Sequence, residues 1–372
     1  MLIGIDAREL CGRPTGVGRY LARLLSSWAE LPEAKAHDFV LFAPDAPASP
    51  PPSAPFDLRI VAGGGGTRWE QFALAAAVNR ARPEVLFAPA YSAPLAARPP
   101  VVLTVHDVSF IVRPEWFRWR ERTRRTWLAR RSARKAALTL AVSQAVRAEI
   151  TTHLGVPPER IRVIPHGVHV PGAAGLQAQP AGGPREALVL YVGSVFNRRH
   201  LPDLVRAFAQ LSRRRSDATL EIVGENRTYP RQDLHRLAAE LGVLDQVHIR
   251  SYVPDDVLEG LYRRAGVFAF LSEYEGFGLP PLEALAAGVP VVLTDTPVAR
   301  EVFGDAAWYA ARGAIDQVAA ALDALLFDAV ARGDLLERAG PVLARYSWDR
   351  AARATLAALE EAARSGGPNR PH

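Results

Sequence analysis

The chain has 372 residues, of which 49% are hydrophobic and 23% are charged, and its formal net charge is +6. This length exceeds the size that one hydrophobic core supports, and the composition excludes a disordered or collagen-like chain, so we expect two globular domains. The single cysteine excludes an internal disulfide and a cysteine-rich metal cluster. The sequence shows neither a signal-peptide pattern nor an uncharged apolar run of about 18 residues, and we therefore expect a cytoplasmic protein.

Short apolar segments recur along the first half of the chain, and each is followed by residues with helical periodicity. The apolar segments cover residues 2–5, 85–88, 101–105 and 138–142. Such alternation is typical of a parallel α/β domain, and we expect a Rossmann-like N-terminal domain over residues 1–170.

Two strand ends in this half carry candidate ligand contacts. Residues 12–20 form a glycine-rich connection to a helix, which lets the backbone approach a phosphate, although Gly16 and Gly18 do not have the spacing of a dinucleotide-binding fingerprint. His106 and Asp107 end the strand at residues 101–105, where ligand-facing residues lie in open α/β sheets. Asp107 stays unassigned.

Residues 113–135 combine many arginines with several aromatic side chains, among them Trp116, Trp119 and Trp127. A basic helix with aromatic residues can bind an anionic membrane surface. The alternative is a solvated helix whose aromatic residues anchor it to the core. The sequence leaves both interpretations open.

Residues 171–186 are rich in Gly, Pro and Ala, and they predict a linker between domains. A second Rossmann-like domain is predicted over residues 187–345, because apolar segments resume at 188–192, 220–223, 247–249, 267–271 and 289–293. Residues 346–372 contain an amphipathic helix pattern. We expect this helix to pack on a domain surface, with the N-terminal domain as the candidate.

Two motifs follow strands of the second domain. After the first strand come a glycine turn at Gly193 and the paired cations Arg198 and Arg199, which suit the negative charge of a diphosphate. After residues 267–271 come Glu275-Gly276-Phe277-Gly278-Leu279 and, eight positions beyond Glu275, Glu283. A turn that opens a helix offers backbone N–H groups to phosphate or sugar oxygens, and the two carboxylates can accept hydrogen bonds from sugar hydroxyls.

The segment with Glu275 and Glu283 is similar to the signature of family 4 retaining glycosyltransferases, and the resemblance covers nearly the whole chain. Residues 193–200 resemble the family's glycine turn, with Arg199 where lysine is usual and His200 where asparagine is usual. The resemblance implies the GT-B architecture, in which two Rossmann-like domains face each other across a cleft. It also implies transfer of a hexose from a nucleoside-diphosphate sugar to a hydroxyl acceptor, with retention of configuration.

The loop from Asp6 to Gly18 is similar to loops of bacterial mannosyltransferases that assemble surface polysaccharides, which favours GDP-mannose as donor. By resemblance, the expected catalytic residues are His106, Arg199 and Glu275. The expected donor contacts are Gly16, Gly18, Gly193, Ser194, Arg198, Arg199, Tyr252, Val253, Glu275, Gly276, Phe277, Gly278, Leu279 and Glu283. We expect no metal and no cofactor, since neither an Asp-x-Asp motif nor a zinc-spaced His/Cys cluster is present.

Two other functions compete with transfer. A sugar-nucleotide epimerase can share this architecture, but it needs no acceptor and works by acid–base chemistry. Nucleic-acid binding is suggested by the net charge alone, and because no nucleic-acid motif is present we expect no such partner. Contact with the inner face of a membrane depends on residues 113–135. The acceptor, the linkage and the oligomeric state are left open.

Overall fold

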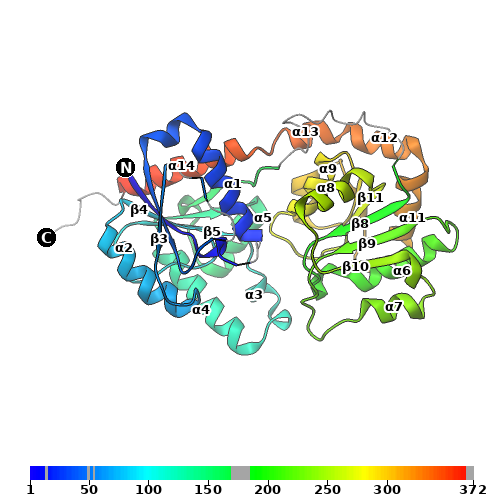
Figure 1. Ribbon diagram of the computed structural model, residues 1–372, viewed down its shortest axis with the longest axis horizontal. Helices are drawn as coiled ribbons and strands as arrows, with labels where there is room; N and C mark the ends of the chain where they lie inside the picture. Colours follow the sequence, from blue (N-terminus) through cyan, green and yellow to red (C-terminus); the bar gives the residue numbers. More distant parts are fainter. Residues whose placement is uncertain (13–15, 48–50, 53–54, 169–184, 366–372) are drawn as a thin grey trace. The chain divides into compact units, whose positions relative to one another are not determined.

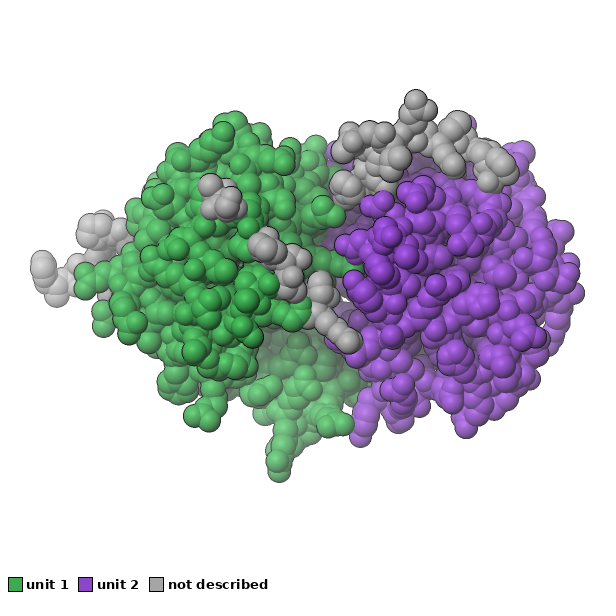
Figure 2. All heavy atoms as spheres, in the orientation of Figure 1, with its two compact units in different colours: residues 1–167, 346–372 green, residues 168–345 purple. Residues whose placement is uncertain are grey.

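The computed structural model describes residues 1–12, 16–47, 51–52, 55–168 and 185–365. It divides into two compact units. Unit 1 comprises residues 1–167 and 346–372, and unit 2 comprises residues 168–345 (Figure 2). Each unit is built on one parallel sheet with helices, so the predicted fold class of two Rossmann-like α/β domains is confirmed. The predicted linker lies outside the described residues, apart from Arg185 and Glu186.

The sheet of unit 1 has the strand order β3-β2-β1-β4-β5-β6-β7, and all its neighbouring strands are parallel. The order reverses beside β1, so ligand-facing loops are expected at the carboxyl ends of β1 and β4. The strands are β1 (Leu2–Asp6), β2 (Asp38–Ala43), β3 (Phe56–Ile60), β4 (Val85–Ala88), β5 (Val101–Val105), β6 (Leu138–Ala141) and β7 (Ile161–Val163).

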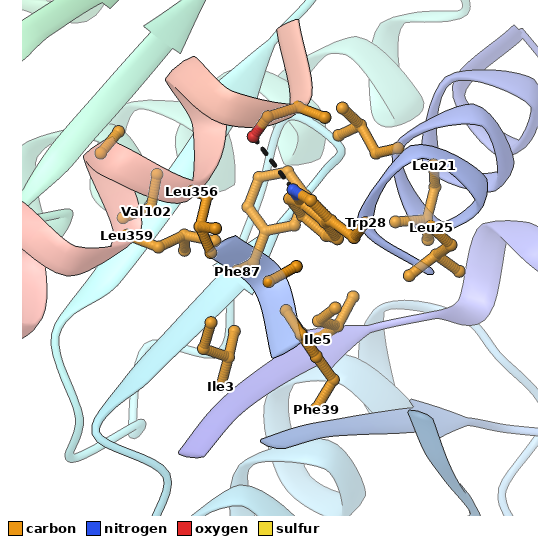
Figure 3. Packing of buried hydrophobic residues seen from close by; sticks show 14 of the residues in the cluster. Ile3, Ile5, Leu21, Leu25, Trp28, Phe39, Phe87, Val102, Leu356 and Leu359 are labelled. Atoms are coloured by element: carbon orange, nitrogen blue, oxygen red, sulfur yellow. Dashed lines mark hydrogen bonds between the residues drawn. The ribbon is translucent and has the colours of Figure 1, made fainter. Parts of the chain in front are cut away.

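The main helices of unit 1 are α1 (Gly16–Glu30), α2 (Ala75–Ala81), α3 (Ser109–Val112), α4 (Trp119–Lys135), α5 (Gln144–Glu149) and the C-terminal α14 (Trp348–Ser365). In Figure 1 the red α14 lies against the blue α1. Trp28 of α1 is fully buried, stacks on Phe39 and donates from Nε1 to the carbonyl oxygen of Ala352 at 3.0 Å (Figure 3). The last helix is therefore part of the core of unit 1.

The sheet of unit 2 has the order β10-β9-β8-β11-β12-β13, again with parallel neighbours, and Figure 1 labels β8 to β11. Its strands are β8 (Leu188–Val192), β9 (Thr219–Val223), β10 (Val247–Arg250), β11 (Val267–Phe270), β12 (Val291–Thr294) and β13 (Trp308–Ala310). The order reverses at β8 and β11, which brings the loops after these two strands next to each other.

The helices of unit 2 are α6 (Leu201–Ser212), α7 (Leu234–Glu240), α8 (Asp255–Arg264), α9 (Leu279–Ala286), α10 (Pro297–Phe303), α11 (Ile315–Phe327), α12 (Ala329–Glu337) and α13 (Ala339–Leu343). Across the parts of both units that the structure describes, no helix is both long and apolar enough to cross a membrane.

Candidate active site

The two motifs of unit 2 meet where strands β8 and β11 end. One loop runs from Gly193 to His200 and contains a short 3-10 helix at Asn197–Arg199, and the other runs from Leu271 to Gly278. The backbone N–H of Glu273 donates to the carbonyl oxygen of Arg198 at 2.9 Å. This hydrogen bond joins the two loops at the carboxyl ends of β8 and β11, where the strand order of the sheet reverses.

Arg199 and Glu275, two residues predicted from sequence to be catalytic, contact each other in this place. Nε of Arg199 donates to Oε1 of Glu275 at 2.9 Å, and their side chains are only 11% and 20% exposed. The same guanidinium donates from Nη1 to the carbonyl oxygen of Ser194 at 2.9 Å and to the hydroxyl of Tyr191 at 3.3 Å. Ser272 donates a further hydrogen bond to Oε1 of Glu275. Glu275 is therefore held in a fixed carboxylate geometry.

Burial disfavours the charge of Arg199, but the Glu275 carboxylate and the Tyr191 hydroxyl outweigh this effect and raise the pKa of the guanidinium above its ordinary value. The guanidinium carbon lies 4.9 Å from the ring centroid of Phe270, within the range of a cation–π contact. Arg199 thus carries a permanent positive charge at the edge of the sheet. Arg198 lies beside it, over the ring of Phe196 at 4.4 Å.

Two glycines make this arrangement possible. Gly193 has φ of +140°, and a side chain there would overlap the guanidinium of Arg199. Gly224 follows β9 with φ of +157°, and a side chain there would overlap the carbonyl oxygen of Gly193. Gly193 was predicted as a donor contact, and the structure adds a separate reason for glycine at this position, which is room for Arg199.

Glu273 was not identified from the sequence, yet its side chain joins three loops. It is 7% exposed, and it lies 2.5 Å from Nη1 of Arg312 and 3.5 Å from Nε2 of His200. The other ring nitrogen of His200 lies 3.4 Å from Asp203 of α6. His200 itself has φ of +49°, a conformation that asparagine adopts more readily than most residues. The one signal available in the sequence was an acidic residue three positions after the end of the buried strand β11.

Helix α9 carries the second predicted carboxylate. Gly278 precedes the helix with φ of +98°, and Pro280 and Pro281 occupy the first turn, where no backbone donor is lost. Oε2 of Glu283 lies 3.4 Å from the hydroxyl of Tyr262 in α8. Phe277 is buried, and Gly276 and Leu279 lie beside it in the turn that opens α9. These predicted donor contacts therefore surround the start of one helix.

Tyr252 and Val253 follow β10, at the edge of the sheet of unit 2. Tyr252 is 65% exposed, whereas Val253 is buried. They lie at the carboxyl end of the sheet, as Arg199 does, but two strands away in the strand order.

The predicted residues of unit 1 gather at the ends of β1 and β5. Gly16 begins α1 and Gly18 is buried in its first turn, while residues 13–15 of the predicted loop lie outside the described residues. Tyr20 of the same helix packs edge-on against His106, with ring centroids 5.0 Å apart. The loop and the histidine are thus neighbours, as their positions after strands suggested.

A backbone hydrogen bond fixes the tautomer of His106. Its Nε2 lies 2.8 Å from the carbonyl oxygen of Pro89, and since a carbonyl only accepts, Nε2 carries a hydrogen, so in the neutral ring Nδ1 is the acceptor. Burial lowers the pKa of His106, and burial together with neighbouring His106 lowers the pKa of His166 far more. The ring centroids of His106 and His166 lie 5.4 Å apart in a stacked arrangement, so protonation of both rings would be strongly disfavoured.

A buried charged cluster lies at the end of β1. Arg8 contacts both Asp6 and Glu70, and Ser92 donates to Glu70 at 2.6 Å. Burial raises the pKa of Asp6 to about 6, although the charge of Arg8 opposes this shift. The sequence did not single out Asp6, Arg8 or Glu70 as site residues. The signal that could have found Asp6 is a carboxylate that ends a wholly apolar strand. Within the described ranges, no group of three His, Cys, Asp or Glu side chains is placed to hold a metal.

Residues 14–170 match the model of Glycosyltransferase Family 4, and residues 177–340 match the model of Glycosyl transferases group 1. Among curated proteins, the chain is 31% identical over 281 residues to the MMP alpha-(1->4)-mannosyltransferase of Mycolicibacterium hassiacum, covering 71% of this chain and 66% of that protein. It is 29% identical over 272 residues to O-antigen chain mannosyltransferase B of Escherichia coli, covering 70% of each. A shorter match, 32% identical over 142 residues, covers 38% of this chain and 36% of the GDP-mannose:cellobiosyl-diphosphopolyprenol alpha-mannosyltransferase of Xanthomonas oryzae.

Two solved structures show the same fold. Anabaena HepE in complex with UDP and glucose superposes with a TM-score of 0.73 at 20% identity, over 96% of this chain and 99% of that chain. WaaG, a glycosyltransferase involved in lipopolysaccharide biosynthesis, superposes with a TM-score of 0.70 at 20% identity, over 99% of this chain and 100% of that chain.

Proposed function

The chain belongs to the family 4, group 1 glycosyltransferases, and from this premise we propose that it transfers a mannosyl group from GDP-mannose to a hydroxyl of a glycan or lipid-linked glycan. The predicted family, the GT-B fold and the enzyme class are confirmed by these matches. The choice of donor is supported by the three curated relatives, all of which are named as mannosyltransferases.

The contact between Arg199 and Glu275 carries the proposal. A departing nucleoside diphosphate gains negative charge, and a permanent guanidinium charge fixed beforehand stabilises that charge without reorganisation. We assign this role to Arg199, with Arg198 beside it. Glu275, Gly276 and the turn before α9 would bind the donor hexose, and Glu283 would accept hydrogen bonds from the ribose hydroxyls.

We also propose a mechanism without a glycosyl–enzyme intermediate. The sequence motifs contain no evident carboxylate nucleophile, and Oε1 of Glu275 accepts from Arg199 and from Ser272, which suits a positioning role for this side chain. We therefore propose a front-face reaction. The bond from the anomeric carbon to the phosphate oxygen breaks as the bond to the acceptor oxygen forms on the same face, and the leaving phosphate takes the acceptor's proton.

In unit 1, we assign to His106 a hydrogen bond from a hydroxyl of the donor sugar, because Nδ1 of the neutral ring can only accept. Gly16 and Gly18, at the start of α1, would let the backbone approach the diphosphate. Tyr252 and Val253 would lie against the nucleobase. The role assigned to His106 requires a neutral ring, since an imidazolium has no acceptor nitrogen.

The test is donor consumption by the purified chain, measured as release of GDP, UDP or ADP from a panel of nucleotide sugars, with and without glycan and polyprenyl-diphosphate glycan acceptors. We expect GDP release from GDP-mannose, faster by at least about 10-fold with a matching acceptor, and loss of this reaction in Arg199→Met. Equal turnover of UDP-sugars would contradict the choice of donor. A product that forms from the sugar nucleotide without acceptor and without diphosphate release would contradict transfer itself.

A further inference from the structure

Helix α4 accounts for the whole positive excess of the protein. Its 17 residues, WRERTRRTWLARRSARK, contain eight basic residues and one acidic residue. The full chain contains 45 basic and 39 acidic residues, which leaves 37 basic and 38 acidic residues elsewhere. The basic character of the chain is therefore a property of one helix and not a diffuse effect of composition.

The orientation of α4 in unit 1 is fixed by its small buried face. Leu128, Ala129, Ser132 and Ala133 are buried, and Oγ of Ser132 accepts from the backbone N–H of Ala93 at 3.0 Å. Arg125 is turned toward the protein as well, and its guanidinium lies 5.5 Å from the ring centroid of Phe110. The opposite face of the helix is consequently exposed.

That exposed face combines arginine with tryptophan. Trp119 is 67% exposed and Trp127 is 54% exposed, so neither ring anchors the helix to the core. At 3.6 residues per turn, a helical arc of about 140° holds both rings together with Thr123, Arg120, Arg124, Arg130, Arg131 and Arg134 and contains no acidic residue. This arrangement decides against the interpretation in which the aromatic residues serve only packing.

Most of the cations on this face are not neutralised. Arg130 and Arg134 donate to the carbonyl oxygens of His153 and Leu154, which leaves their charge in place. Arg131 lies 5.7 Å from the ring centroid of Trp127. Among residues that the structure describes, none places a carboxylate within ion-pair distance of Arg120, Arg124 or Arg131.

We propose that the exposed face of α4 docks the protein on a lipid bilayer that contains anionic headgroups. Arginine binds lipid phosphates, and indole rings favour the headgroup region of a membrane, where one edge is apolar and the other wet. A single-stranded nucleic acid would instead need a groove that tracks its backbone, whereas this face is one straight helix about 25 Å long. The proposal does not depend on the identity of the donor.

The experiment uses the full chain and sucrose-loaded vesicles of phosphatidylcholine, with and without about 30% phosphatidylglycerol. We expect binding only to the anionic vesicles, weaker at high salt. Each basic residue near such a surface contributes about fivefold to binding, so Arg120→Gln/Arg124→Gln/Arg131→Gln should bind about 100-fold more weakly. Arg213→Gln/Arg214→Gln/Arg231→Gln removes the same charge from exposed positions of unit 2 and should bind like wild type.

The rings are tested by Trp119→Ala/Trp127→Ala, which should lose the blue shift of tryptophan emission that anionic vesicles cause in wild type. Unchanged melting temperatures in all three variants keep the comparison independent of folding. Equal binding to neutral vesicles, no binding to either kind, or an equal loss in the unit 2 control would overturn the proposal. So would vesicle binding that is unaffected by the three arginines while salt-sensitive binding of a single-stranded RNA depends on them.

Discussion

Nε of Arg199 donates to Oε1 of Glu275 across 2.9 Å and thereby joins the loop after β8 to the loop after β11. The resemblance of residues 193–200 to the family's glycine turn led us to expect lysine at this position. Lysine presents its donors from a single point, whereas the planar guanidinium reaches Glu275, the Ser194 carbonyl and the Tyr191 hydroxyl at once. The arginine therefore fixes both loops as well as supplying charge.

Removing this guanidinium is expected to impair turnover more than binding. In Arg199→Met, kcat should fall by about 100- to 1000-fold, because the leaving diphosphate loses a preorganised cation and Glu275 loses its partner. Arg199→Lys should recover part of the loss. Steady-state rates at saturating donor provide the measurement, with Arg206→Met as control, since Arg206 is 45% exposed and pairs only with Asp203 in the described structure. Wild-type kcat in Arg199→Met would contradict the assignment.

A side chain at Gly193 should displace the same guanidinium. Gly193→Ala places a methyl group where Arg199 lies, on a backbone with φ of +140°, so we expect a stability loss of about 1–3 kcal/mol together with reduced activity. Gly260→Ala is the matched control. Gly260 lies inside α8, where an added methyl group would meet only the end of the Arg263 side chain at van der Waals distance, and alanine there should stabilise the protein by about 0.5–1 kcal/mol. Urea unfolding of both variants checks these opposite signs.

Glu273 is expected to position the donor without touching it. Glu273→Ala removes the carboxylate that lies between His200 and Arg312, so the loop carrying Arg198 and Arg199 should loosen. The KM for the donor should rise about 10-fold, as expected when donor binding loses one charged hydrogen bond. The kcat should change less than about threefold. His200→Asn, which suits the left-handed backbone, should stay near wild type. Equal losses of kcat and kcat/KM in Glu273→Ala would indicate a role in the chemical step.

The buried carboxyl of Asp6 predicts a specific pH dependence of stability. Its pKa is about 6 in the folded chain, raised by burial from an ordinary value of 3.8, so the folded state favours the protonated form. Below about pH 4, Asp6 contributes on the order of 3 kcal/mol to the free energy of unfolding. This contribution is lost as the pH rises through about 6. Wild type should therefore lose stability relative to Asp6→Asn over this window. Urea unfolding of both proteins at several pH values measures the difference, and a gain by wild type with rising pH would refute burial as the cause of the raised pKa.

The sequence predicted most of the architecture, and two of the missed strands differ in pattern or length from those that were found. The segments expected at residues 2–5, 101–105 and 188–192 are β1, β5 and β8. Strand β3 was missed because its sequence FDLRI, at the sheet edge, is not a continuous apolar run like the strands that were predicted, and β13 because it has three residues. Strand β2 was also missed, although FVLFA is as apolar as the segments that were identified.

The sequence predicted the positions of the two candidate-site loops of unit 2 better than the contacts between them. The strand ends at Gly193 and Glu275 were identified by apolar runs and glycine turns, and parallel topology brings them together. The pair of Arg199 and Glu275 could not be read from spacing, because 76 residues separate its members. The cluster of Asp6, Arg8 and Glu70 was missed for the same reason, since it exists only after folding buries residues that are distant along the chain.

We propose above all that unit 2 holds a nucleoside diphosphate between Arg199 and Glu283, and the most direct measurement is the melting temperature of the chain in GDP, UDP, ADP, CMP and dTDP. A ligand that binds only the native state raises this temperature in proportion to the logarithm of its concentration over Kd. We expect a selective rise with GDP that shrinks in Glu283→Gln, whose binding should be about 10-fold weaker, and in Arg199→Met. A rise that is equal in wild type and both variants, or no rise with any nucleotide, would contradict this placement of the donor.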